Sequence, residues 1–277
     1  MIPQKLIDKG KYWTKACSLV EGCTPVSEAC DNCWLQSQAH RFKQCICNEN
    51  GISKPLTDAY SGKWTGHISI REDRLNIPLK TRKPQVFAVW SDLFHEAVPD
   101  GFIARALTIM ERCYHAGKEQ HKHTFLILTK RIERMQDFFK NFATKTVSPI
   151  QVTPNIFIGT TAENQEQADK RIPELLKIPG NKFLSVEPML GPINLFNSVN
   201  AIFGTLRHPP YVSNISQVIC GGETGRNARP CNPDWVRRLR DQCAEAGVPF
   251  FFKGFGGKKK GRILDGRTHD ELAWNEY

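Results

Sequence analysis

The chain has 277 residues, of which 40% are hydrophobic and 24% charged, so it is large enough and apolar enough to bury a core. It contains no apolar run of about 18 residues and begins without the apolar centre of a secretory signal, so we expect a cytoplasmic protein with no membrane contact. Lys and Arg exceed Asp and Glu by 38 to 28, and the resulting net charge of +10 favours polyanionic partners such as DNA or RNA, or phosphorylated small molecules.

Short apolar runs alternate with longer amphipathic runs along most of the chain. The apolar runs predict strands at residues 12–19, 86–90, 124–128, 155–159, 182–186, 217–220 and 249–252. The amphipathic runs predict helices at residues 34–43, 102–115, 132–142, 164–178 and 233–246, the last with Asn232 as its N-cap. This alternation is typical of parallel strands joined by right-handed crossovers. We therefore predict an α/β fold, a partial (β/α)6–7 TIM-like barrel, with a doubly wound open sheet as the alternative.

The domain organisation follows from where this alternation stops. Residues 1–255 are expected to form the partial barrel, and residues 45–81 interrupt the pattern as an insertion. Residues 194–216 form a second irregular stretch. Residues 256–277 are rich in Gly and Lys and are expected to form a basic C-terminal extension at the surface.

Polar residues follow nearly every predicted strand. The strand ends carry Ser91-Asp92, Thr129-Lys130-Arg131, Thr160-Thr161-Ala162-Glu163, Ser185-Val186-Glu187, Gly221-Gly222-Glu223 and Lys253. The C-terminal ends of the strands form the active-site face of a (β/α) barrel. Six polar strand ends on one face therefore indicate a ligand pocket.

Six of the ten cysteines lie within residues 17–47, and three of these form the pattern Cys23-x6-Cys30-x2-Cys33. Disulfides are unlikely to form in a reducing compartment, so metal binding is the leading interpretation. Three thiolates on a four-iron cluster leave one iron open to a small bidentate molecule, and thiolates are the usual ligands of such clusters. Structural zinc is the alternative, with Cys17, Cys45 or Cys47 as the fourth ligand.

The segment from Thr14 to Trp34 resembles a phage-encoded, radical-SAM-like family with three signature cysteines. Further blocks that match the family are Ser91–Glu96, Ile127–Arg131, Leu184–Pro192, Gly221–Gly225, Ala228–Pro230 and Gly247–Lys253. The family is distantly similar to spore photoproduct lyase, and its substrate is not established. The chain departs from the common C-x3-C-x2-C spacing and carries Trp34 where the family usually has Tyr.

The resemblance implies a partial TIM barrel of radical SAM type, which binds a 4Fe–4S cluster and S-adenosyl-L-methionine (SAM). The implied metal ligands are Cys23, Cys30 and Cys33. The implied cofactor-binding residues are Ser91 and Asp92 for the SAM amino group, Lys130 or Arg131 for its carboxylate, Thr161, Glu163 and Glu187 for the ribose, and Gly221 and Gly222 for the adenine. The implied substrate-binding residues are Glu223 and Lys253. Without the resemblance, Asp92 is interpreted as a helix cap or a turn acceptor, and Lys130 and Lys253 as members of surface ion pairs.

Three functions follow from these observations. The first is a radical SAM enzyme of a bacterial or phage-infected cell that abstracts hydrogen from its substrate, with a nucleic-acid base, modified or repaired, as one candidate. Such an enzyme needs a reductant protein for its cluster. The second is a zinc-stabilised nucleic-acid-binding protein without catalysis. The third is a radical SAM enzyme for a small metabolite.

Overall fold

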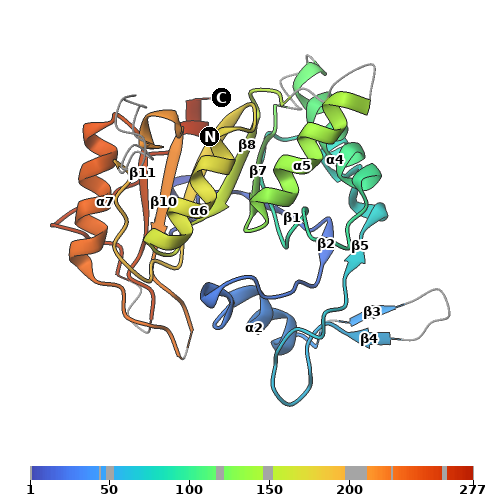
Figure 1. Ribbon diagram of the computed structural model, residues 1–277, viewed down its shortest axis with the longest axis horizontal. Coiled ribbons are helices and arrows are strands. Elements are labelled where there is room, and N and C mark those ends of the chain that lie inside the picture. Colours follow the sequence, from blue (N-terminus) through green and yellow to red (C-terminus); the bar gives the residue numbers. More distant parts are fainter. Residues whose placement is uncertain are drawn as a thin grey trace.

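The computed structural model (Figure 1) describes residues 2–43, 45–47, 53–116, 122–145, 152–196, 211–225, 227–257 and 261–276. A sheet of seven parallel strands forms its centre. The strands are β1 (Lys15–Cys17), β6 (Val86–Val89), β7 (Thr124–Thr129), β8 (Ile156–Thr161), β9 (Asn181–Val186), β10 (Gln217–Gly221) and β11 (Phe250–Gly254). Each coincides with one of the seven predicted strands to within a few residues.

The strands follow the order β1-β6-β7-β8-β9-β10-β11, so each lies beside its neighbour in the chain. Within the described sheet, β1 and β11 each pair with a single strand, and the sheet curls into an open half-barrel. The prediction of a parallel α/β sheet is confirmed, and the half-barrel is compatible with a partial TIM-like barrel. A strictly sequential order also disfavours a doubly wound sheet, in which the strand order reverses.

Four helices cross between successive strands and cover the outer face of the sheet (Figure 1). They are α4 (Asp100–His115), α5 (Ile132–Lys145), α6 (Gln165–Leu176) and α7 (Pro233–Glu245). Asn164 and Asn232 cap α6 and α7, since their side chains accept hydrogen bonds from Gln167 N at 3.0 Å and Asp234 N at 2.9 Å. These helices and the Asn232 cap agree with the prediction. None of the described helices is long and apolar enough to cross a membrane.

The strands have two faces because successive side chains point to opposite sides. On the outer face Phe87, Val89 and Ile127 belong to the buried cluster that includes residues of α4 and α5. On the inner face Val86, Leu126, Phe157, Phe183, Ile219 and Phe251 share one buried cluster. Both faces are therefore apolar, which explains the continuous hydrophobic runs of these strands.

The C-terminal tail differs from the expected surface extension. Leu264, Leu272 and Trp274 are buried, and Trp274 is only 1% exposed. The Trp274 ring lies 5.3 Å from that of Phe157, and its Nε1 donates a 3.0 Å hydrogen bond to the carbonyl of Tyr12. The tail thus fills the inner face of the half-barrel near the N-terminus, because the open sheet leaves apolar side chains there to be covered. The three consecutive lysines of this extension, residues 258–260, lie outside the described residues.

The region predicted as an insertion, 45–81, contains small antiparallel pieces outside the seven-stranded sheet. β3 (Cys45–Cys47) pairs with β4 (Ser53–Pro55), and β5 (Ser69–Ile70) pairs with β2 (Val20–Glu21). The second pair fixes the start of the cysteine loop. Three short helices, α1 (Gln4–Ile7), α2 (Trp34–Arg41) and α3 (Ile77–Lys80), complete the N-terminal part.

Gly159 in the middle of β8 provides a test of this packing. A methyl group added there would lie 2.5–2.6 Å from ring carbons of the buried Phe183. We expect Gly159→Ala to lower the free energy of unfolding by about 1–3 kcal/mol, measured by urea denaturation. Gly101→Ala in α4 is the control, because the nearest atom lies 3.9 Å away and Ala favours helix, so stability should stay unchanged or rise by up to about 1 kcal/mol. Equal effects at the two sites would contradict the packing described.

Candidate functional site

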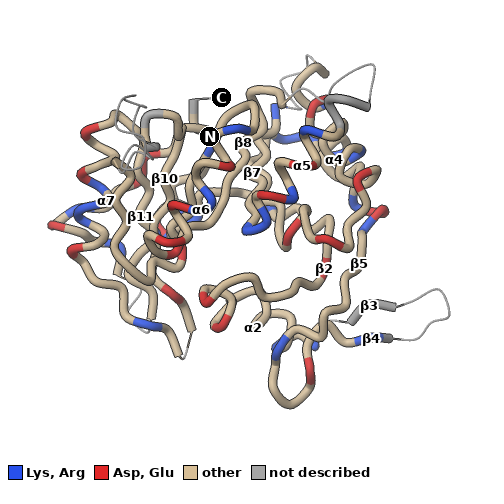
Figure 2. The backbone as a smooth tube through the Cα atoms, viewed as in Figure 1, with Lys and Arg blue, Asp and Glu red and all other residues tan. Residues whose placement is uncertain are grey.

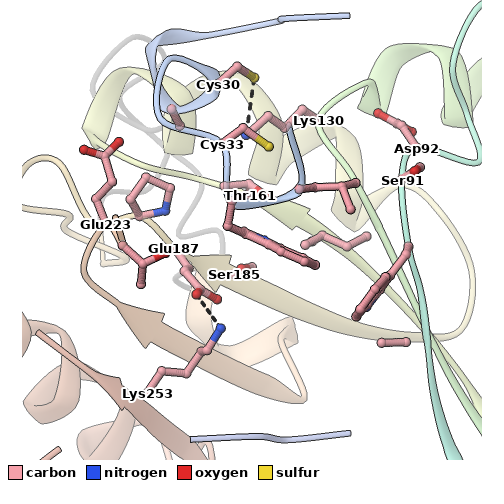
Figure 3. Close-up of a pocket in the computed structure, with 18 of the residues that line it drawn as sticks. Cys30, Cys33, Ser91, Asp92, Lys130, Thr161, Ser185, Glu187, Glu223 and Lys253 are labelled. Atoms are coloured by element: carbon pink, nitrogen blue, oxygen red, sulfur yellow. Dashed lines mark hydrogen bonds and ion pairs between the residues drawn. The ribbon is translucent and has the colours of Figure 1, made fainter. Parts of the chain in front are cut away.

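A cavity of about 900 Å³ opens at the C-terminal ends of the strands. Its lining includes Cys23, Cys30 and Cys33 from the loop after β2, together with side chains from the ends of β6, β7, β8, β9 and β11. Figure 3 shows Cys30 and Cys33 on one side of the cavity and Glu187 and Lys253 on the other. The predicted convergence of polar strand ends with the cysteine loop is therefore present.

The alternation along β9 shows how the sequence builds this lining. Phe183, Ser185 and Glu187 line the cavity, whereas Leu184 and Val186 belong to the cluster that packs under the helices. On the cavity side of β9, the polar residues Ser185 and Glu187 therefore follow the apolar Phe183 at intervals of two residues. Leu126, Leu128 and Lys130 do the same around the end of β7.

Gly22 allows the chain to turn into the cysteine loop. Its φ is +87°, and a Cβ at this position would lie 2.0 Å from the carbonyl oxygen of His67. Only glycine avoids both the strained backbone and this clash. Cys23 follows directly, and the loop continues through a short 3-10 turn, Glu28–Cys30, to α2, for which Cys33 is the N-cap residue.

Arg131 fixes the first part of this loop to the sheet. Its guanidinium pairs with Asp92 at 2.9 Å and with Glu96 at 2.8 Å, and the Arg131 side chain is 6% exposed. It also donates to the backbone and side-chain oxygens of Thr24 at 3.1 and 2.7 Å. Burial alone would lower the pKa of Arg131, but the Asp92 carboxylate raises it above the ordinary value. The charge is therefore permanent and holds Thr24, the neighbour of Cys23.

His95 completes the contacts of Thr24. Its Nδ1 accepts from the backbone N–H of Ala97 at 3.1 Å, so Nε2 carries the proton and donates to the Thr24 hydroxyl at 2.9 Å. Burial and the nearby Arg131 lower the pKa of His95, which favours this neutral form. His95 therefore has a positioning role in the described structure.

A second set of contacts fixes the far side of the loop. Glu223 accepts from the Asn32 amide at 2.9 Å and from Arg229, whose side chain also donates to the carbonyl of Glu28 at 2.9 Å. Asn164 donates to the Glu28 carboxylate at 2.9 Å. Burial alone would raise the pKa of Glu223, but these hydrogen bonds from Arg229 and Asn32 lower it, so Glu223 is an anion. The loop is thus held from β7 on one side and from β8 and β10 on the other.

The surroundings of the thiols differ. Lys130 lies 3.6 Å from Cys30 Sγ, and the backbone N–H of Val26 donates to the same sulfur at 3.4 Å. Burial acts to raise the pKa of Cys30, but Lys130 and the backbone N–H groups lower it overall, which favours the thiolate. Burial and the Asp92 carboxylate raise the pKa of Cys23 to about 11, with Arg131 4.0 Å from its sulfur. Among the described residues, no three Cys, His, Asp or Glu side chains form a group that could hold a metal ion.

Most of the predicted site residues are brought together. Those that line the cavity are Cys23, Cys30, Cys33, Ser91, Asp92, Lys130, Thr161, Glu187, Gly222, Glu223 and Lys253. Several of these already have partners. The Asp92 carboxylate accepts from Thr129 Oγ1 at 2.7 Å and from Phe94 N at 3.0 Å, in addition to Arg131. Lys253 forms an ion pair with Glu187 across the cavity floor.

Two predicted residues do not line the cavity. Glu163 is fully buried and pairs with Arg171 of α6 at 2.9 Å, so its side chain turns toward the helix layer. Gly221 packs under Lys253 and Glu187. At Gly222 a Cβ would lie 2.0 Å from the carbonyl oxygen of Phe255, so this glycine is required by the chain's own backbone rather than by a ligand.

Sequence reasoning missed two kinds of residue. It did not assign the groups that hold the loop, Thr24, Asn32 and Arg229, because their partners Arg131, Glu223 and Glu28 lie far away in the chain. It treated Ser185 as one of many polar strand ends and Tyr12 and Trp13 as strand residues, although all three line the cavity. The thiol of Cys17, a proposed fourth ligand, is buried in the core outside the cavity lining, and the side chains of Cys45 and Cys47 lie outside the described residues.

Fold and site define the chain as a parallel α/β half-barrel protein with a cysteine-bearing loop over a polar cavity. A family model described as a protein of unknown function (DUF5131) matches residues 10–273, so the chain belongs to this family. Comparisons with curated proteins and with solved structures gave no match.

Arg131 provides the test of the loop's attachment. Arg131→Gln leaves the buried Asp92 without its counter-ion, so we expect a loss of about 3 kcal/mol in the free energy of unfolding. Hydrogen exchange of residues 23–33 should also accelerate. Arg105→Gln is the control, because this arginine pairs with Glu72 and is 55% exposed, and it should change stability by less than about 1 kcal/mol. Unchanged exchange in the loop of Arg131→Gln would show that Arg131 does not hold it.

Proposed function

We propose that the protein is a radical SAM enzyme whose cluster is held by Cys23, Cys30 and Cys33. The observation that carries the proposal is that all three thiols line one cavity with the polar ends of the parallel strands. The open half-barrel and the sequence resemblance support the same class. The family match adds no activity, because that family is described as one of unknown function.

The donor set fits an iron–sulfur cluster by its chemistry. The three residues are cysteines without disulfide bonds, each partly exposed rather than sealed in the core. Thiolates are the usual cluster ligands, and Lys130 and Arg131 supply positive charge near two of them. Binding would have to draw the thiols closer together than they lie in the described structure. The loop contains a single 3-10 turn between Cys23 and Cys33, so this adjustment breaks no strand or long helix.

The cluster, when bound, would supply the electron that cleaves the sulfonium of SAM and so starts hydrogen abstraction. The chain's own residues would then bind and orient the cofactor. Lys130 is the available cation on the loop side and suits the SAM carboxylate. Ser91 and Thr161 offer hydroxyls at the cavity wall. Asp92 already accepts from three donors, so its contribution is to fix Arg131 rather than to bind the cofactor directly.

Anaerobic reconstitution with iron and sulfide tests the proposal. We expect about four iron atoms per chain, a brown absorbance, and cleavage of SAM to 5′-deoxyadenosine when a reductant is added. Cys23→Ala, Cys30→Ala and Cys33→Ala should each lose most of the bound iron and the cleavage.

Cys231→Ala is the matched control for these variants. Cys231 is also partly exposed but does not line the cavity, so its loss should leave iron content unchanged. One zinc per chain with no uptake of iron would favour the zinc-stabilised alternative and overturn the proposal.

A further inference from the structure

The wall of the cavity beside the cysteine loop is aromatic. Trp13, Trp34, Trp64 and Trp90 all line it. The Trp90 ring lies 5.4 Å from Trp13 and 5.1 Å from Trp34, at interplanar angles of 87° and 77°. Trp34, at the start of α2, is 45% exposed. Large aromatic rings that stay open to a cavity offer flat faces to a planar ligand.

The floor of the cavity holds a polar group without a partner. The Ser185 side chain is buried, and its Oγ makes no hydrogen bond among the described residues. Buried hydroxyls nearly always have partners, so this one is expected to meet a ligand. Glu187 and Lys253, joined as an ion pair, lie close to it on the same floor (Figure 3). The floor therefore presents hydroxyl, carboxylate and ammonium groups to the edge of a ligand.

Exposed cations stand at the rim. Lys9 and Lys11 line the cavity and are exposed, and the Lys11 ammonium lies 4.9 Å from the centre of the Trp13 ring. Elsewhere the described Lys and Arg residues are interspersed with Asp and Glu (Figure 2). In this view the positive residues do not gather on one part of the tube, so the two lysines beside the cavity are the relevant positive charges.

We propose that this part of the cavity binds one nucleobase of a single-stranded nucleic acid. The base stacks on the tryptophan wall, its hydrogen-bonding edge meets Ser185 and the Glu187–Lys253 pair, and its phosphates lie near Lys9 and Lys11. The inference deepens the proposed function by naming the substrate class of the same cavity. A volume of about 900 Å³ is near the upper end of the range for ligand pockets, so a base fits beside a cofactor.

Alternative ligands use fewer of these features. An apolar metabolite would leave Ser185 and the Glu187–Lys253 pair without contacts. A small anion would use the lysines but not the four tryptophans. A nucleobase on a phosphodiester chain combines a flat ring, donors and acceptors on one edge, and negative charge outside the pocket, and it therefore matches the wall, the floor and the rim together.

Oligonucleotide binding to the full-length protein without iron or SAM tests the inference. Ten-nucleotide DNA and RNA strands, each with one 2-aminopurine, are titrated, and anisotropy and 2-aminopurine fluorescence are followed. We expect binding with quenched fluorescence, because the base stacks on tryptophan. Trp34→Ala should weaken binding about tenfold or more and abolish the quenching. Tyr114→Ala is the matched control, since Tyr114 is 47% exposed and lies outside the cavity lining.

Ser185→Ala tests the floor of the cavity through two measurements, thermal stability and binding, which we expect to respond differently. Because the Ser185 hydroxyl has no partner, its removal should leave the thermal unfolding midpoint unchanged or raise it, while binding weakens severalfold. Thr160→Val is the contrast, because the Thr160 hydroxyl donates to the carbonyl of Thr129 at 2.8 Å and lies outside the cavity lining. This variant should unfold at lower temperature and bind normally.

The salt dependence of binding and a comparison of different ligands complete the test. Replacing Lys9 and Lys11 with Gln should weaken all strands equally and lower the salt dependence of binding by one to two phosphate contacts. If DNA binds more tightly than RNA, or the reverse, the tighter ligand identifies which sugar the site prefers.

The inference would be overturned if a free nucleoside monophosphate bound as tightly as the strand, or if Trp34→Ala and Tyr114→Ala had equal effects. Because no cofactor is present, absent strand binding with intact SAM cleavage overturns only the substrate class, and the reverse result overturns only the cofactor chemistry.

Discussion

The buried charge of Arg131 is the constraint on which the cysteine loop depends. A guanidinium at the end of β7 needs counter-ions, and Asp92 and Glu96 supply them from the segment after β6. Its remaining donors then reach Thr24, so two neighbouring strands and the loop share one group. A buried ion pair of this kind contributes little net stability but tolerates few other geometries. Its effect here is to place Cys23 over the mouth of the sheet.

The opposite end of the loop is held in a similar way, but by a buried anion instead of a buried cation. Glu223, at the end of β10, is the buried anion, and Arg229 and Asn32 are its donors. One end is therefore fixed by a cation of the sheet and the other by an anion. Between them the thiols stay partly exposed to the cavity. Both ends of the loop are thus held by charged hydrogen bonds, while the three thiols between them line the cavity.

The sequence predicted the sheet well because parallel strands buried on both faces read as continuous apolar runs and the helices between them as amphipathic ones. It also located the cavity, since Lys130, Glu187 and Lys253 follow apolar runs directly. It placed Glu163 in the cavity, but this residue lies beyond the strand end, where a side chain can turn to the cavity or, as found, to Arg171. Contacts such as Asn32 to Glu223 join residues 191 apart, and no local pattern reports them. Trp274 was misplaced in a surface tail because composition does not show which face it covers.

The two proposed ligands of the cavity use different side chains, so they need not compete. Lys130 and the thiols lie on the loop side, whereas Ser185, Glu187 and Lys253 lie on the floor (Figure 3). Asp92 is engaged by Phe94, Thr129 and Arg131, so it has little capacity left for a ligand ammonium. Glu187, by contrast, can exchange Lys253 for a ligand donor without leaving a buried strand end uncompensated, because both side chains remain partly exposed. The Glu187–Lys253 ion pair on the floor can therefore be replaced by a ligand, whereas the Arg131–Asp92 ion pair is permanent and holds the loop.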